Sequence, residues 1–208
     1  MDDTPPLEST WTLFTHKQSL SNNYSSVYDE AVSCSTIGEF WRIYNNVPTA
    51  SDLCHKAVCI HNELIVAFSF FRKPHVPEWE DPHNPEGSEW GCRDIISCQA
   101  IDQMWLHVLL AAVGEKLRHT VGLRVVNKST KLRACHKIEV WMNSCDDRCT
   151  RELFADLQIA LQGIDTLPEF SFMEHNKKRQ QATEYYSRRR VNHPRRTQGP
   201  MSHSTHNL

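Results

Sequence analysis

The sequence predicts an α+β fold, a single domain in which three helices cover one face of an antiparallel β-sheet and leave the other face open. Short strand-like segments follow one another through turns, which favours antiparallel pairing. Three amphipathic segments with helical spacing are separated by such strands, so they are expected to pack on one common sheet. At 208 residues, the chain suits one such domain with a tail.

The first half of the chain predicts three strands and a helix. Residues 11–16 alternate and are rich in strand formers, residues 27–33 suggest a second strand, and residues 64–71 form an apolar run typical of a buried strand. The Ser35-Thr36 pair can cap a helix that has Glu39 in its first turn. Apolar side chains then recur at helical spacing, at Ile37, Phe40, Trp41 and Tyr44.

Two stretches of this half are predicted to be loops. Residues 17–26 are polar and carry one aromatic side chain, Tyr24. Residues 72–87 contain four prolines, and proline removes a backbone donor and disfavours helix just before it. Residues 54–62 stay ambiguous. Because long loops in compact domains are usually functional or disordered, the proline-rich stretch is a candidate for function.

The second half predicts further strands and two helices. A strongly amphipathic segment predicts a helix over residues 101–118, and a second helix over 151–161 is ended by Gly163. Residues 128–136 form a basic turn. Strands are predicted over 89–99 (one strand, or two with a turn), 122–127, 137–143 and 170–172.

Charge divides the chain into two parts. The net charge is −2, but the segment from Glu174 to the end has eight basic and two acidic residues, a balance of +6 that leaves −8 for the rest. We therefore expect a flexible arm over residues 1–9, a folded domain over 10–175 and a basic tail over 176–208 that is too polar to fold alone. The tail could contact RNA backbone, act as a localisation signal or serve solubility, and these alternatives stay open.

Composition argues against export and metal binding. No apolar run approaches the ~20 residues that span a bilayer, and the acidic N-terminus lacks the apolar core of a secretory signal. A cytoplasmic protein, with a nuclear fraction as the alternative, is expected to keep its eight cysteines reduced. Cys54-His55 with Cys59 and His61 match no recognised zinc spacing, so neither a metal nor a cofactor is expected.

The tripeptide Trp79-Glu80-Asp81 in the proline-rich loop indicates a binding function. An indole offers a π face and a neighbouring carboxylate accepts hydrogen bonds, which suits a flat, electron-poor base. 7-Methylguanine fits, because methylation at N7 makes the purine cationic and leaves N–H donors at N1 and the exocyclic amine. The alternative is a tryptophan that covers the core beside two solvated acids.

Six motifs follow one another in an order and spacing that resemble the eukaryotic translation initiation factor 4E family. They are Pro6-Leu7, Trp11-x-Leu13, Glu39-Phe40-Trp41-x-x-Tyr44-Asn45, Trp79-Glu80-Asp81, Trp105-Leu106-x-x-Leu109-Leu110 with Gly114-Glu115, and Lys137-Ile138-x-Val140-Trp141. The resemblance covers roughly residues 6–175, and departures in the body suggest a divergent, trypanosomatid-like member. It implies a non-catalytic factor that binds the 7-methylguanosine 5′ cap of mRNA and recruits the mRNA to the translation initiation machinery. The implied fold is a curved antiparallel sheet with three helices on its convex face and the cap pocket on its concave face.

The resemblance also implies which residues read the base. Trp79 matches one of two rings that sandwich it, and the other is Tyr24, thirteen residues past Trp11, where the family commonly has tryptophan. A phenol can still stack on a cationic base, although an indole does so better. Glu80 matches the carboxylate that takes the base's N1 and N2 donors. Trp141 matches the tryptophan that touches the N7 methyl group, but it also suits a strand core.

The cap's triphosphate needs cations. Lys137 matches one phosphate contact of the family, and Lys128 falls in the place of the other when positions are counted from Gly122. The turn between them is longer than usual in the family, so three further basic residues stay open for the role: Arg124, Lys131 and Arg133. In a body of charge −8, such a cluster indicates an anion site, and the alternative is a solvated basic turn.

A partner site follows from the same resemblance. Family members bind a Tyr-x-x-x-x-Leu-Φ helix of the scaffold factor 4G, or of competing repressors, on the convex face, and binding of this kind uses apolar anchors. His107 stands where the family has an acidic residue, which puts the usual partner sequence in doubt. No membrane contact is implied, and the protein is expected to be a monomer outside the complex. The matching anchors are Pro6, Leu7, Ile37, Trp41, Leu106 and Leu110.

Two other functions are weighed against scaffold recruitment. A cap-binding repressor would keep the cap pocket and lose the scaffold. A cap or nucleotide hydrolase would need a metal-holding carboxylate cluster, or a cysteine that a placed base activates. Cys135-His136 are sequence neighbours, which does not bring their side chains together. The acids that superficially offer a cluster lie in a loop and not on a helix face: Glu78, Glu80, Asp81, Glu86 and Glu89.

Overall fold

Antiparallel strands form one continuous sheet in the computed structural model, which describes residues 4–18, 28–55, 58–95, 97–129, 135–164 and 168–177. The strand order is β2-β1-β4-β6-β7-β5-β8, and β3 pairs with β4 outside this path. The strands are β1 Pro6–Lys17, β2 Tyr28–Thr36, β3 Cys59–Ile60, β4 Glu63–Arg72, β5 Ser88–Ile95, β6 Thr120–Asn127, β7 His136–Met142 and β8 Phe170–Glu174. The helices are α1 Ile37–Tyr44, α2 Asp52–His55, α3 Cys98–Val113 and α4 Asp147–Ala160.

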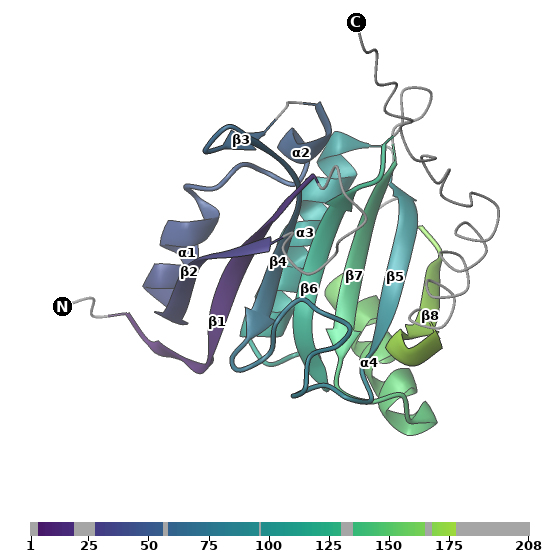
Figure 1. Ribbon diagram of the computed structural model, residues 1–208. Coiled ribbons are helices and arrows are strands. Elements are labelled where there is room, and N and C mark those ends of the chain that lie inside the picture. Colours follow the sequence, from purple (N-terminus) through teal and green to yellow (C-terminus); the bar gives the residue numbers. More distant parts are fainter. Residues whose placement is uncertain are drawn as a thin grey trace, which may run out of the picture.

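The helices lie on one side of the sheet. Figure 1 shows α3 and α4 behind the sheet. The loop that joins β4 to β5 lies in front of the sheet, on the side opposite these helices. We call the side opposite the helices the open face. The predicted fold class, a single α+β domain with an antiparallel sheet and helices on one face, is confirmed.

The main core lies between the sheet and the helices. Successive side chains of a strand point to opposite faces, so every second residue reaches this core. Trp11 of β1 stacks on Phe70 of β4 with ring centroids 5.7 Å apart. The helices contribute Phe40 from α1, Ile101, Met104 and Val108 from α3, and Leu153 and Leu157 from α4.

Helix α1 begins where its capping residues predict. The Thr36 hydroxyl accepts from the Glu39 N–H at 3.2 Å, and the Glu39 carboxylate accepts from the Thr36 N–H at 3.2 Å. This reciprocal capping box satisfies two of the N–H groups that a helix start leaves without partners. The predicted cap is therefore confirmed.

The two longer helices begin earlier than predicted. Helix α3 begins at Cys98, because the Ser97 hydroxyl accepts from the Ala100 N–H at 3.3 Å. The segment 89–99, predicted as one strand or two with a turn, therefore contains the single strand β5. Helix α3 ends at Val113, five residues before the predicted end, and Gly114 caps it.

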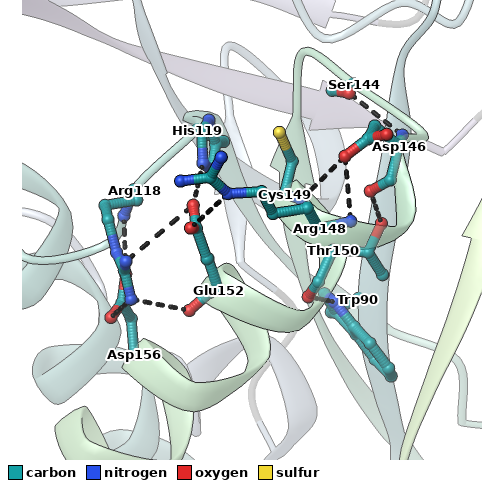
Figure 2. A network of polar contacts seen from close by, with 10 residues as sticks. All are labelled: Trp90, Arg118, His119, Ser144, Asp146, Arg148, Cys149, Thr150, Glu152 and Asp156. Carbon is teal, nitrogen blue, oxygen red and sulfur yellow. Dashed lines mark hydrogen bonds and ion pairs between the residues drawn. The ribbon is translucent and has the colours of Figure 1, made fainter.

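Helix α4 is fixed at its start and along its length by polar contacts (Figure 2). The Asp146 carboxylate accepts from the Arg148 N–H at 2.8 Å, so the helix begins at Asp147 and not at the predicted residue 151. Arg118 holds Asp156 through three hydrogen bonds, one from its backbone N–H at 3.0 Å and two from its guanidinium at 2.8 and 2.7 Å. The hydrogen bond from Arg118 lowers the pKa of the Asp156 carboxyl. These contacts tie α4 to the turn that precedes β6.

The remaining segments differ from prediction mainly at their ends. Strand β1 begins at Pro6, inside the segment 1–9 that was expected as an arm. The ambiguous stretch 54–62 contains the end of α2 and the short strand β3. Of the predicted tail, residues 178–208 lie outside the described part of the chain. No helix in the described ranges is both long and apolar enough to cross a membrane.

Candidate functional site

A second, smaller apolar cluster lies on the open face. Its buried members are Phe14, Phe71, Val121 and Trp141. The rings of Phe71 and Trp141 meet edge to face, with centroids 5.2 Å apart. A Cβ atom at Gly122 would lie only 2.3 Å from the Phe71 ring, so glycine is what lets this ring lie flat against β6.

A buried carboxylate fixes the loop between β4 and β5. The Asp81 side chain is 1% exposed and accepts from the backbone N–H groups of Val76 at 3.2 Å and His83 at 2.9 Å. Its oxygens also lie 3.2 and 3.1 Å from Nδ1 of His75 and His83. The loop held in this way packs Trp79 against the apolar cluster of the open face.

The same loop presents an acid next to this indole. Tyr28 of β2 also packs on the cluster, and its hydroxyl donates to the Glu78 carboxylate at 2.9 Å. Burial and this carboxylate raise the pKa of Tyr28 to about 12. Glu80 is exposed, and no hydrogen bond or ion pair with another described residue engages its carboxylate. The loop therefore offers Trp79 and an available acceptor side by side in sequence.

The two predicted tryptophans come together on the open face. Trp141 is 1% exposed, its Nε1–H donates to the Glu139 carboxylate at 3.1 Å, and its ring lies 4.3 Å from the His175 ring. Trp79 packs on the cluster to which Trp141 belongs. Tyr24, the second predicted stacking ring, lies outside the described residues.

The predicted phosphate-binding lysine is already paired with two acids. Lys137 Nζ lies 2.7 Å from Glu89 Oε1 and 2.6 Å from Glu139 Oε1, and its side chain is 7% exposed. Burial lowers the pKa of Lys137, but the charges of the two carboxylates outweigh it, so the pKa is raised overall. Arg124 Nη1 lies 3.8 Å from Glu139 Oε2, so the structure brings Arg124 and Lys137 to the same carboxylate.

The other predicted cations divide into described and undescribed residues. Lys128 is exposed at the end of β6, and its pKa is lowered by desolvation and by the charge of Arg124. Lys131 and Arg133 lie outside the described residues. On the same side of the sheet, burial and Arg124 lower the pKa of His16 to about 3, so this imidazole is neutral at physiological pH.

Sequence reasoning missed two members of this polar group, Glu139 and His175. A signal for the first was available. Side chains at i, i+2 and i+4 of a strand share one face, so placing Lys137 and Trp141 on the open face also places Glu139 there. The contact of Glu89 with β7 depends on pairing between strands distant in sequence, and no local pattern reveals it.

An apolar groove of about 340 Å³ lies between the start of β1, α1 and the end of α3. It is lined by five of the predicted partner-binding residues: Pro6, Leu7, Ile37, Trp41 and Leu110. Leu106 and His107 are not among its lining residues. The His107 ring instead faces the end of α4, where Nδ1 donates to the Ala160 carbonyl at 3.0 Å. The groove contains two acids from other positions, Glu8 and Glu115.

The fold disperses the carboxylates that a hydrolase would need to hold a metal together. Asp81 clamps the loop, Glu78 pairs with Tyr28, and Glu89 pairs with Lys137. The described residues contain no group of three or more histidine, cysteine, aspartate or glutamate side chains that could hold a metal ion.

A family comparison identifies this arrangement. The sequence model of eukaryotic initiation factor 4E matches residues 6–190. The chain belongs to the eukaryotic initiation factor 4E family. This family is a group of non-enzymatic, cap-binding translation initiation factors, which removes the hydrolase alternative.

Relatives of the 4E family agree over most of the chain. Eukaryotic translation initiation factor 4E-2 of Schizosaccharomyces pombe is 33% identical over 147 residues, which cover 70% of this chain and 56% of that relative. Factor 4E-1 of the same yeast is 32% identical over 181 residues, covering 83% of this chain and 77% of the relative. The chain therefore spans little more than half of the first relative's length.

Solved structures of 4E proteins share the fold. The complex of C. elegans eIF4E-3 with the 4E-binding protein Mextli and cap analog has a TM-score of 0.69 at 21% identity, and the match covers 85% of this chain and 95% of that one. The complex of Ascaris suum eIF4E-3 with the m7G cap has a TM-score of 0.68 at 21% identity, covering 83% and 92%. At these identities the likeness establishes the 4E fold.

Proposed function

We propose that this chain binds the 7-methylguanosine 5′ cap of mRNA on its open face and recruits the mRNA to the translation initiation machinery. The observation that carries the proposal is the pairing of Trp79, packed on the apolar cluster, with the exposed carboxylate of Glu80 next to it in the same clamped loop. The indole would stack on the cationic base, and the carboxylate would accept from its N1 and N2 donors.

The other residues of the proposed pocket have supporting roles. Tyr24 would supply the second stacking ring, and Trp141 would form the wall nearest the methyl group. The basic residues that remain candidates for the phosphate chain are Arg124, Lys128, Lys131, Arg133 and Lys137. Two neighbouring structures, which are complexes with a cap analog and with the m7G cap, support the choice of ligand.

We further propose that the apolar groove binds an amphipathic helix of a 4G-type scaffold or of a 4E-binding repressor. Ile37, Trp41 and Leu110 expose 41, 37 and 38% of their surface there, which is unusual for large apolar side chains in one groove. A basic side chain of the partner would meet exposed Glu8, in place of the acid that His107 replaces, because Glu115 is already paired with Arg72 at 2.6 Å. Structures of neighbours with Mextli and with 4E-BP support a partner of this kind.

Several finer expectations belong to this proposal. The protein would be cytoplasmic, with a nuclear fraction as the alternative, and monomeric outside its complex. A repressor that binds the cap without the scaffold is the second candidate function, favoured by the departure at His107. The trypanosomatid-like character stays a prediction, as does a role for the basic tail in RNA contact.

Titration with 7-methyl-GTP and with GTP tests the cap-binding proposal. Stacking on Trp79 should quench tryptophan fluorescence strongly with the methylated nucleotide and only weakly with GTP. The nucleotide should remain intact and no added metal should be needed. Equal affinity for GTP would contradict the proposal, because positive charge on the base would then be irrelevant to binding.

A further inference from the structure

The open face contains a buried ion cluster, Glu89–Lys137–Glu139, in which one ammonium is shared by two carboxylates. The two N–O distances are 2.7 and 2.6 Å, and the three side chains are almost completely buried. Arg124 approaches Glu139 at 3.8 Å, and His175 Nε2 lies 3.5 Å from the other oxygen of Glu89. The cluster therefore has its acids supplied by two neighbouring strands, β5 and β7.

The backbone is adapted to this cluster. Gly91 lies two residues after Glu89 on the same face of β5 and pairs with Glu139 of β7. A Cβ atom at Gly91 would lie 2.9 Å from Cε and 3.3 Å from Nζ of Lys137. The glycine thus leaves the space in which the lysine lies across β5 to reach Glu89.

The charge of the cluster disfavours a phosphate chain. Two carboxylates and one ammonium sum to −1, and Arg124 brings the sum of these four side chains to zero. An incoming phosphate would have to displace a carboxylate from Lys137 while the second carboxylate repels it. The neutral imidazole of His16 adds no positive charge on this face.

We infer that Glu89 and Glu139 are specificity-determining residues that make cap recognition depend on the methylated base and only weakly on the number of phosphates. This inference rests on the proposed cap-binding function. Among the described cations outside the cluster, exposed Lys128 and Arg93 can still attract phosphate, but exposed ion pairs of this kind add about tenfold in affinity or less. The chain would therefore accept 7-methylguanosine ends with shortened phosphate chains nearly as well as a full triphosphate.

The decisive experiment compares the affinities of the full chain for 7-methyl-GMP, 7-methyl-GDP and 7-methyl-GTP. We expect the mono- and triphosphate to differ by less than about tenfold, with a weak dependence on salt. A steep gain with each phosphate would overturn the inference and leave the proposed function intact. Failure of all three nucleotides to bind would overturn the proposed function itself.

Variants test the cause of this tolerance. In Glu89→Gln/Glu139→Gln, Lys137 is freed for phosphate, so the ratio of triphosphate to monophosphate affinity should rise by about tenfold or more. The control Glu86→Gln removes an exposed acid from the neighbouring loop and should leave the ratio unchanged. An unchanged ratio in a folded double variant would overturn the inference. If the double variant does not fold, the same ratio measured in Glu139→Gln, together with the ratio in the wild type, tests the inference.

Discussion

Replacing Asp81 by alanine tests whether the clamped loop creates the proposed base site. The substitution removes the acceptor of two backbone N–H groups, at 3.2 and 2.9 Å, and of the Nδ1 contacts of His75 and His83. A hydrogen bond to a charged group contributes about 1.5–3 kcal/mol, so loss of the two backbone bonds alone removes about 3 kcal/mol or more from the ordered loop.

That loss appears in binding if the ligand needs the ordered loop. When the competent conformation becomes a minor one, the apparent affinity falls in proportion, and a loss of about 3 kcal/mol corresponds to at most about 150-fold. Fluorescence titration with 7-methyl-GTP measures it. Asp81→Asn keeps one acceptor oxygen and should lie between wild type and alanine. Glu86→Ala removes an exposed acid from the same loop and should bind within about twofold of wild type.

A second measurement separates loop order from global stability. Hydrogen exchange of the backbone amides in residues 73–87 should accelerate in Asp81→Ala, while amides of the central strands β4, β6 and β7 keep their protection. Wild-type affinity together with wild-type exchange in this loop would refute the reasoning, because the clamp would then contribute nothing to the position of Trp79.

Three further predictions address the base, the partner and the stability of α4. Glu80→Ala should weaken 7-methyl-GTP binding by about 3 kcal/mol or more in the same titration, because two charge-assisted hydrogen bonds are lost, and wild-type affinity would contradict the assigned role. Trp41→Ala should abolish binding of a Tyr-x-x-x-x-Leu-Φ peptide in calorimetry yet leave cap affinity unchanged, since the groove and the open face lie on opposite sides of the sheet. The lowered pKa of Asp156 means that its bond with Arg118 stabilises the fold at neutral pH and that this stability is lost as pH falls through the lowered value. Asp156→Asn should therefore lower Tm at neutral pH but not at a pH below the lowered pKa of Asp156, and an equal loss at both pH values would contradict this origin.

The sequence predicts those parts of the fold that depend on local chemistry. The capping box of Thr36 and Glu39 and the alternation in β1 act over a few residues, so they can be identified without tertiary information. The start of α3 was wrong because residues 98 and 99 were assigned to the preceding strand. The boundary between β5 and α3 is marked by the Ser97 hydroxyl, which accepts from the Ala100 N–H and so caps the helix. Ser97 is itself a common strand-end residue, so its capping role is ambiguous before the helix is seen.

In the candidate site, the pairing of an indole with an acid can be predicted from the local sequence, whereas the ion pairs and the clamp around it cannot. Trp79 and Glu80 are adjacent in sequence, so their combination was visible at once, and the prolines around them correctly indicated a loop. The clamp that positions them was not visible, because an aspartate between two histidines of a loop has many alternative partners. The Asp81 side chain is only 1% exposed, and this burial strengthens its hydrogen bonds, but the burial arises only when the loop folds.

A count of cations along the chain leaves out the acids that pair with them in the fold. The stretch 124–137 contains basic residues close together, which favoured an anion site. Two of them, Arg124 and Lys137, face Glu139 from the same or the adjacent strand, and Lys137 also meets Glu89, which is 48 residues away in sequence. The field that a ligand meets depends on such pairs and not on the local sum. In the proposed cap site, the base would therefore contribute more of the affinity than the phosphates.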